Sequence, residues 1–128
     1  MITQDPDYDI ASLKEFFTTA EDYDAETILD ELLVQQKAGQ MLCLIGSDDA
    51  GITGFIIGFV FHKSLWIDQS YHRKDAPFTE AKEGFEMAKE WAREKGLTSI
   101  TGETQRGQER AMGRFGFKPF STVQKCKL

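Results

Sequence analysis

The chain has 128 residues and a formal charge of −6, with 41% hydrophobic and 28% charged residues. This length predicts one domain, residues 1–128, and the composition excludes a disordered chain. The negative charge disfavours binding to nucleic acid or to an anionic membrane surface. The longest apolar run, Ile52–Phe61, is too short to span a bilayer, so we expect neither nucleic acid nor a membrane as a partner.

The N-terminal sequence and the cysteines indicate a cytoplasmic protein without a metal centre. "MITQDPDYD" lacks the positive charge and apolar core of a signal peptide. Cys43 and Cys126 are therefore expected to be reduced thiols in strands, not a disulfide framework. Together with His62 and His72 they show no metal-ligand spacing, so we expect no metal.

Two amphipathic helices are predicted near the N-terminus. Asp9 is a candidate N-cap for the first helix and Asp24 for the second, and Gly39 ends the second. The first helix places on one face Ile10, Leu13 and Phe16 or Phe17. The second places on one face Ile28, Leu29, Leu32 and Leu33.

The next segment predicts a meander of three antiparallel strands. Strands over 41–46, 52–62 and 65–70 are separated by the turn "SDDAG" and by a break at Lys63 and Ser64. Both faces of the middle strand are apolar. One face carries Ile52, Ile56 and Val60, and the other carries Phe55, Ile57, Phe59 and Phe61. We therefore expect helices on both faces of the sheet.

A long helix follows, because apolar residues recur at intervals of three and four. This stripe consists of Phe78, Ala81, Phe85, Ala88 and Ala92. Gly96 ends the helix. "LTSITGET", residues 97–104, predicts a strand parallel to the strand before the helix. A short helix over 108–114 and a last strand over 118–127 complete the prediction.

The segment "YHRKDAPFTEAKEG", residues 71–84, is basic in an otherwise acidic chain. It lies between a predicted strand and the start of a helix, where free N–H groups and the helix dipole attract anions. It contains no glycine before Gly84, and Pro77 removes one N–H donor from the first turn. Both a phosphate-binding loop and a solvated basic turn are compatible with this pattern.

The order of these elements resembles that of the GNAT superfamily of acyl-CoA-dependent N-acyltransferases. Two stretches are similar to that family: "EMAKEWAREKG", residues 86–96, to its central helix, and "ERAMGRFGFKPF", residues 109–120, to its late helix and Gly-Phe pair. The resemblance covers residues 40–128 by sequence and the N-terminal helices by arrangement only. It implies an α/β (α+β) fold with a mixed, mainly antiparallel sheet of about six strands and helices on both faces. Small acetyltransferase-like proteins of bacteriophages are similar in size.

The resemblance implies acetyl-CoA as co-substrate, bound through the loop before the long helix. The family pattern there is Arg/Gln-x-x-Gly-x-Gly/Ala. This chain keeps the last small residue as Ala81 but has Thr79 at the glycine and Ala76 at the basic position. The basic triplet His72, Arg73 and Lys74 would then supply the charge. The residues implied to contact acetyl-CoA are Gln69, Ser70, Arg73, Lys74, Phe78, Thr79, Ala81, Gln105 and Met112.

Two family positions near the leaving thiolate are changed. The frequent acid, a tyrosine four residues before the glycine of the Gly-Phe pair, corresponds to Met112. Tyr71 would substitute for it only if its loop folds inward. Gln105 occupies the position where the family often has asparagine.

A base is still needed to remove a proton from the attacking amine. Asp68 and Glu103 are the candidate catalytic residues, because the family's site lies where their two strands separate. For either residue taken singly, an ordinary exposed carboxylate at a strand end is the more common interpretation. His62 is a third candidate, although a single histidine at a strand end is usually structural.

The leading interpretation is an acetyl-CoA-dependent N-acetyltransferase that transfers acetyl directly to a primary amine. The acceptor would be an amine-bearing small molecule, a protein lysine or an N-terminus, and the acidic chain favours a cationic one. The alternative is a catalytically degenerate GNAT-like module that binds CoA or a protein partner. A monomer and a homodimer are both compatible with the sequence.

Overall fold

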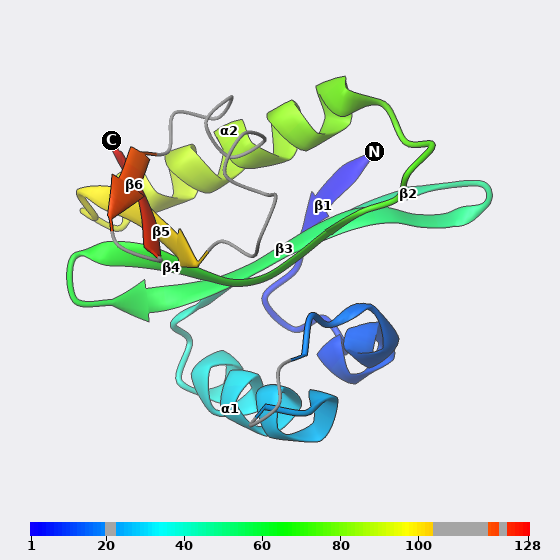
Figure 1. Ribbon diagram of the computed structural model, residues 1–128, viewed down its shortest axis with the longest axis horizontal. Coiled ribbons are helices and arrows are strands. Elements are labelled where there is room, and N and C mark those ends of the chain that lie inside the picture. Colours follow the sequence, from blue (N-terminus) through cyan, green and yellow to red (C-terminus); the bar gives the residue numbers. More distant parts are fainter. Residues whose placement is uncertain (20–22, 104–117, 121–122) are drawn as a thin grey trace.

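The computed structural model describes residues 1–19, 23–103, 118–120 and 123–128, and their strands form one twisted sheet (Figure 1). The elements in chain order are β1 (Ile2–Gln4), the 3-10 helix η1 (Ile10–Phe16), α1 (Ala25–Lys37), β2 (Met41–Asp48), β3 (Gly51–Phe61), β4 (Ser64–His72), α2 (Phe78–Glu94), β5 (Ser99–Glu103), β6 (Lys118–Phe120) and β7 (Val123–Lys127). Among the described residues, seven strands pair in the order β1-β2-β3-β4-β5-β7-β6. Of the strand pairs in the described parts of the chain, only β4 with β5 is parallel.

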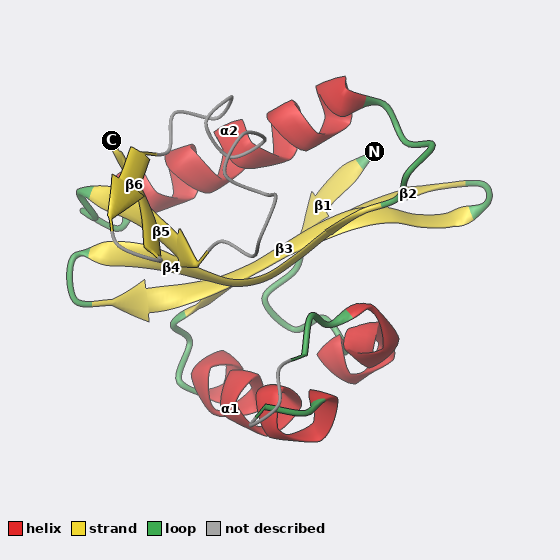
Figure 2. Ribbon diagram, viewed as in Figure 1, coloured by secondary structure: helices red, strands yellow, loops and turns green. Residues whose placement is uncertain are grey.

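The predicted mixed sheet with helices on both faces is confirmed (Figure 2). The meander of β2, β3 and β4 and the parallel crossover through α2 also agree with the prediction. Two strand predictions were wrong. The edge strand β1 was not predicted, and the single strand expected over 118–127 consists of two antiparallel strands, β6 and β7. The short helix expected over 108–114 lies outside the described residues.

Each face of the sheet has its own hydrophobic core. The core under η1 and α1 contains Ile10, Leu13, Phe17, Ile28, Leu29, Leu32, Met41, Cys43, Ile45, Phe55 and Ile57. The core under α2 contains Leu42, Leu44, Leu65, Phe85, Ala88, Trp91, Ala92, Ile100 and Cys126. No helix in the described parts of the chain is long and apolar enough to cross a membrane.

The helix caps agree only in part with the sequence patterns. Asp24 caps α1 by accepting a hydrogen bond from the Thr27 N–H at 2.8 Å. Asp9 precedes η1 but makes no side-chain cap, and η1 is a 3-10 helix.

Leu33 and Phe78, predicted on buried faces, are 42% and 48% exposed. Leu33 lies beside the buried stripe of α1, and Phe78 begins α2 where the helix starts to cover the sheet.

A β-bulge in β3 moves one apolar side chain to the other face of the sheet. Gly46 pairs with Gly54 and Ser47 with Ile52, so the register skips Thr53. Ile52 therefore packs with the core under α1, not on the face of Ile56 as predicted. An extra residue in a strand reverses the alternation on one side of it.

Gln69 joins β4 to the segment that leads toward α1. Its buried amide accepts a hydrogen bond from the Thr18 N–H at 2.7 Å and donates one to the Thr18 carbonyl at 3.3 Å. Both backbone groups of Thr18 are thus satisfied by one side chain. This contact fixes the segment after η1 against the sheet.

Leu32 is 1% exposed, so Leu32→Ala should lower the free energy of unfolding by about 2–5 kcal/mol through loss of burial and the cavity left behind. Leu33→Ala, its neighbour on α1, should cost about 1 kcal/mol or less. Urea unfolding followed by circular dichroism measures both. Equal losses would contradict the orientation of α1 described here.

Gln69→Leu should lower the free energy of unfolding by about 1–3 kcal/mol, because it leaves the N–H and carbonyl of Thr18 without their partner. Ser70→Ala, at the exposed neighbouring position, is the control and should change it little. The same unfolding measurement compares them. A Gln69→Leu variant as stable as the parent would show that the amide does not hold this segment.

Candidate functional site

The sheet opens between its two parallel strands. Paired residues run from Ser64 and Ser99 to Ile67 and Gly102, after which β4 continues to His72. No strand among the described residues pairs with 68–72 on the β5 side. The N–H and C=O groups on that side of β4 can therefore bond to an extended ligand, as in β-strand addition.

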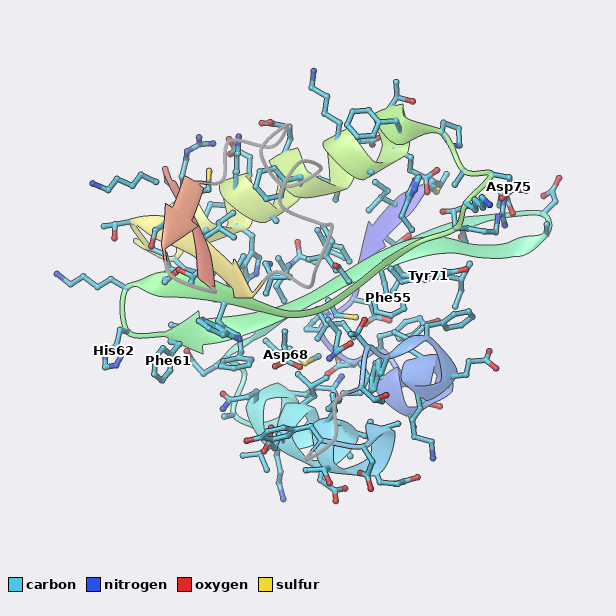
Figure 3. All side chains as sticks on the ribbon, in the orientation of Figure 1. Phe55, Phe61, His62, Asp68, Tyr71 and Asp75 are labelled. Carbon is cyan, nitrogen blue, oxygen red and sulfur yellow. The ribbon has the colours of Figure 1, made fainter. Side chains whose placement is uncertain are left out.

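Asp68 lies at the point where this opening begins. Ile57 pairs with Gln69 and Gly58 with Ile67, so the register of β4 skips Asp68, as in a β-bulge. In Figure 3 Asp68 lies between the sheet and α1. It lines a pocket there together with residues of α1 and with Phe59.

Glu103, the other candidate base, is the last residue of β5. Its backbone pairs with that of Val123 in β7. Ile67 and Gly102 are the last paired residues of β4 and β5, so Asp68 and Glu103 are the next residue of each strand. The fold therefore brings both candidate bases to the point where the strands separate. The side chain of Glu103 and the predicted contact residues Gln105 and Met112 lie outside the described parts of the chain.

His62 and Tyr71, the other two candidates, each contact an aromatic ring. His62 forms the β3–β4 turn with a positive φ of 56°, and its ring contacts the Phe61 ring edge-on at 4.4 Å. Figure 3 shows it at the opposite end of the sheet from Tyr71 and Asp75. The Tyr71 ring packs on Phe16 at 4.6 Å.

The residues after the bulge divide between the two faces of the sheet. The side chain of Gln69 is occupied by Thr18, so only its backbone is at the open edge. Ser70 is exposed. A contact between Gln69 and a ligand would therefore be made through main-chain atoms.

Arg73 is bound by two carboxylates. Its guanidinium donates to Asp48 at 2.5 and 3.1 Å and to Asp75 at 2.5 Å, while its N–H donates to the Thr53 carbonyl at 2.7 Å. The guanidinium beside Asp48 lowers the pKa of that carboxyl below its usual value. The ion pair is thus present at pH above the ordinary carboxyl pKa and is lost only as pH falls through the lowered one.

Arg73 therefore ties the β2–β3 turn to the loop before α2, with its charge balanced by Asp48 and Asp75. Sequence analysis missed this pairing. The two aspartates of "SDDAG" and the basic triplet were the available signal, since opposite charges at neighbouring turns attract. Lys74 is exposed and remains the cation of this loop for which the structure gives no ion pair.

The first turn of α2 is open to solvent. Pro77 is the N-cap residue and provides no side-chain cap, and Phe78 and Thr79 are exposed. The first N–H groups of a helix have no intrahelical partners, so this turn can bind an anion. Ala81 is partly buried one turn on.

Glu80 in the same turn faces the sheet. Its carboxylate accepts a hydrogen bond from the Thr53 hydroxyl and lies 3.9 Å from the N-terminal ammonium. It fills the space above Gly46, where a Cβ would come within 2.4 Å of it. The start of α2 is thereby fixed on β2 and β3.

The Cys43 thiol is buried in the core under α1. Burial raises the pKa of the Cys43 thiol to about 12, which removes the reactive thiolate at neutral pH. Within residues 1–19, 23–103, 118–120 and 123–128, no three His, Cys, Asp or Glu side chains form a group that could hold a metal ion.

The fold is similar to those of solved N-acetyltransferases, although the sequence matches no protein-family model and no curated protein. PaiA N-acetyltransferase from Thermoplasma acidophilum, solved with coenzyme A, matches with a TM-score of 0.72 and 16% identity, over 100% of this chain and 99% of its own. The ribosomal-protein-S18-alanine N-acetyltransferase of Escherichia coli matches with 0.74 and 11%, over 99% and 94%.

The GNAT family N-acetyltransferase YhbS of Escherichia coli, solved with CoA, matches with a TM-score of 0.71 and 14% identity, over 99% of this chain and 80% of its own. These matches span nearly the whole of the present chain. Residues 1–37, which resembled the family only by arrangement, are thus included in the similarity. The protein has the fold of the GNAT N-acetyltransferases.

Proposed function

We propose that this protein is an acetyl-CoA-dependent N-acetyltransferase that transfers the acetyl group directly to a primary amine. The observation that carries the proposal is the separation of β4 from β5 at the Asp68 bulge. The open edge of β4 leads within five residues, 73–77, to the open first turn of α2. One strand and its loop thus connect a site for an extended amide chain to a site for phosphates.

The two ends of acetyl-CoA suit these two sites. The amides of its pantetheine arm can bond to the backbone of β4 beyond Asp68, and its pyrophosphate can accept from the first N–H groups of α2. Lys74 adds positive charge beside that turn. Because Arg73 is already balanced by Asp48 and Asp75, we assign it to holding the loop and not to the phosphates.

The chemistry requires one base. The amine nitrogen attacks the thioester carbonyl carbon, a C–N bond forms and the amine proton passes to the Asp68 carboxylate. The C–S bond then breaks and CoA leaves as thiolate, which takes a proton from solvent. A thiol of ordinary pKa, ~8.5, is an adequate leaving group, so a methionine at 112 slows this step without preventing it.

A non-catalytic CoA-binding module is the competing function, favoured by the neutralised Arg73 and by Met112 at the position of the family's tyrosine. Two measurements separate them. Acetyl-CoA should raise the melting temperature by mass action in both cases. Release of free CoA with a panel of amines is expected only of the enzyme.

Asp68→Asn should lower kcat by about 10²–10⁴-fold, the usual contribution of a general base, and leave acetyl-CoA binding unchanged. Glu103→Gln, at the matched position on β5, should have a much smaller effect. Steady-state release of CoA with an amine in excess measures both. A large loss in Glu103→Gln with none in Asp68→Asn would assign the base to β5 instead.

Lys74→Ala should weaken CoA binding by about 2- to 5-fold at low salt, since an exposed ion pair contributes ~0.5–1 kcal/mol. The effect should shrink as salt screens it. Lys82→Ala, an equally exposed lysine one turn further along α2, is the control. Calorimetric titration would refute phosphate binding at this turn if both variants bound CoA like the parent.

A further inference from the structure

A pocket of about 250 Å³ lies between α1 and the sheet, on the face opposite α2. Its lining residues are Glu31, Leu32, Val34, Gln35, Phe59 and Asp68. Helix α1 contributes the first four, and strands β3 and β4 contribute Phe59 and Asp68. Figure 3 shows Asp68 between the sheet and α1. Asp68 thus belongs both to the opening beside β4 and to this pocket.

The lining has the character of a site for an aliphatic cation. Val34 and Phe59 provide apolar surface that can cover a methylene chain. The two carboxylates come from opposite walls, Asp68 from the bulge of β4 and Glu31 from the exposed side of α1. None of the lining residues in the described parts of the chain is cationic, so an anionic ligand would find no oppositely charged partner among them.

The two carboxylates on opposite walls can contact two different groups of one acceptor. An amine that is to be acetylated must give up its proton, which the proposed function assigns to Asp68. Glu31 is then available for a group that keeps its charge throughout. A carboxylate can accept several hydrogen bonds, so contacts of either residue within the fold are compatible with a bound ligand.

We infer that this pocket binds the acceptor as an aliphatic diamine, with Glu31 binding the ammonium that does not react while Asp68 faces the amine that does. The inference rests on the proposed function, because it uses Asp68 as the base. It identifies Glu31 as a residue that determines specificity. The same arrangement would accept a lysine side chain that carries a second cation nearby.

The test compares cadaverine with n-pentylamine, which has the same carbon chain and lacks the second ammonium. In the parent, kcat/KM for cadaverine should exceed that for pentylamine by about three- to tenfold, as expected of a charged hydrogen bond at a partly exposed site. Glu31→Gln should remove this preference by lowering kcat/KM for cadaverine to about the value for pentylamine in the same variant. Asp30→Asn, an exposed neighbour on α1 outside the pocket lining, should keep the preference.

Asp30→Asn changes the net charge by the same amount as Glu31→Gln. It therefore separates binding in the pocket from general attraction of a cation to an acidic protein. A preference that persists in Glu31→Gln, or is lost equally in Asp30→Asn, would overturn the inference. So would a parent that does not favour cadaverine. In each of these cases acetylation itself would still uphold the proposed function.

Calorimetric titration of cadaverine into the CoA-saturated protein provides a readout without turnover. Cadaverine should bind the parent and the Asp30→Asn variant and bind Glu31→Gln about three- to tenfold more weakly. Glu31-dependent binding without acetylation would uphold the pocket while refuting the proposed function. Binding that is absent, or insensitive to Glu31, would refute the pocket.

Discussion

The separation of β4 from β5 is the constraint on which the rest of this structure depends. The two strands are paired as far as Ile67 and Gly102, and the bulge at Asp68 comes at the next residue of β4. A bulge bends its strand and increases its twist. Beyond the bulge, β4 remains paired with β3 as far as His72, whereas its pairing with β5 has ended at Ile67. Among the described residues no strand pairs with this part of β4 on the β5 side, which is where the proposed function places the ligand.

The two faces of the sheet have different parts in the proposed reaction. On one face, α2 begins beside the end of β4, and Glu80 and Arg73 fix that start through Thr53 and Asp48. On the other face, Gln69 holds the segment before α1, and α1 closes one wall of the pocket around Asp68. In the proposed function, the bulge joins the co-substrate site on the first face to the acceptor site on the second.

The parts of the fold that sequence predicted are those set by local periodicity. The stripe of α2, the Asp24 cap and the alternating meander each depend on residues a few positions apart. The bulge at Thr53, the exposure of Leu33 and the pairing of Arg73 with Asp48 depend on contacts between distant segments. For the site, the resemblance to the family made Asp68 and Glu103 the candidate bases, and their roles stay predictions. The sequence did not reveal the pocket, because the helix register that brings Glu31 opposite Asp68 follows from packing.

The most direct test of the account is to map where coenzyme A perturbs the backbone amides, by two-dimensional NMR of the isotope-labelled protein. The account predicts the largest changes at residues 68–72 of β4 and 78–81 of α2, with few in β1 and β2. Since the open edge and the helix start are joined by one loop, both groups should shift along the same titration curve. Binding that perturbs neither group, or only residues far from the separation of β4 and β5, would contradict it.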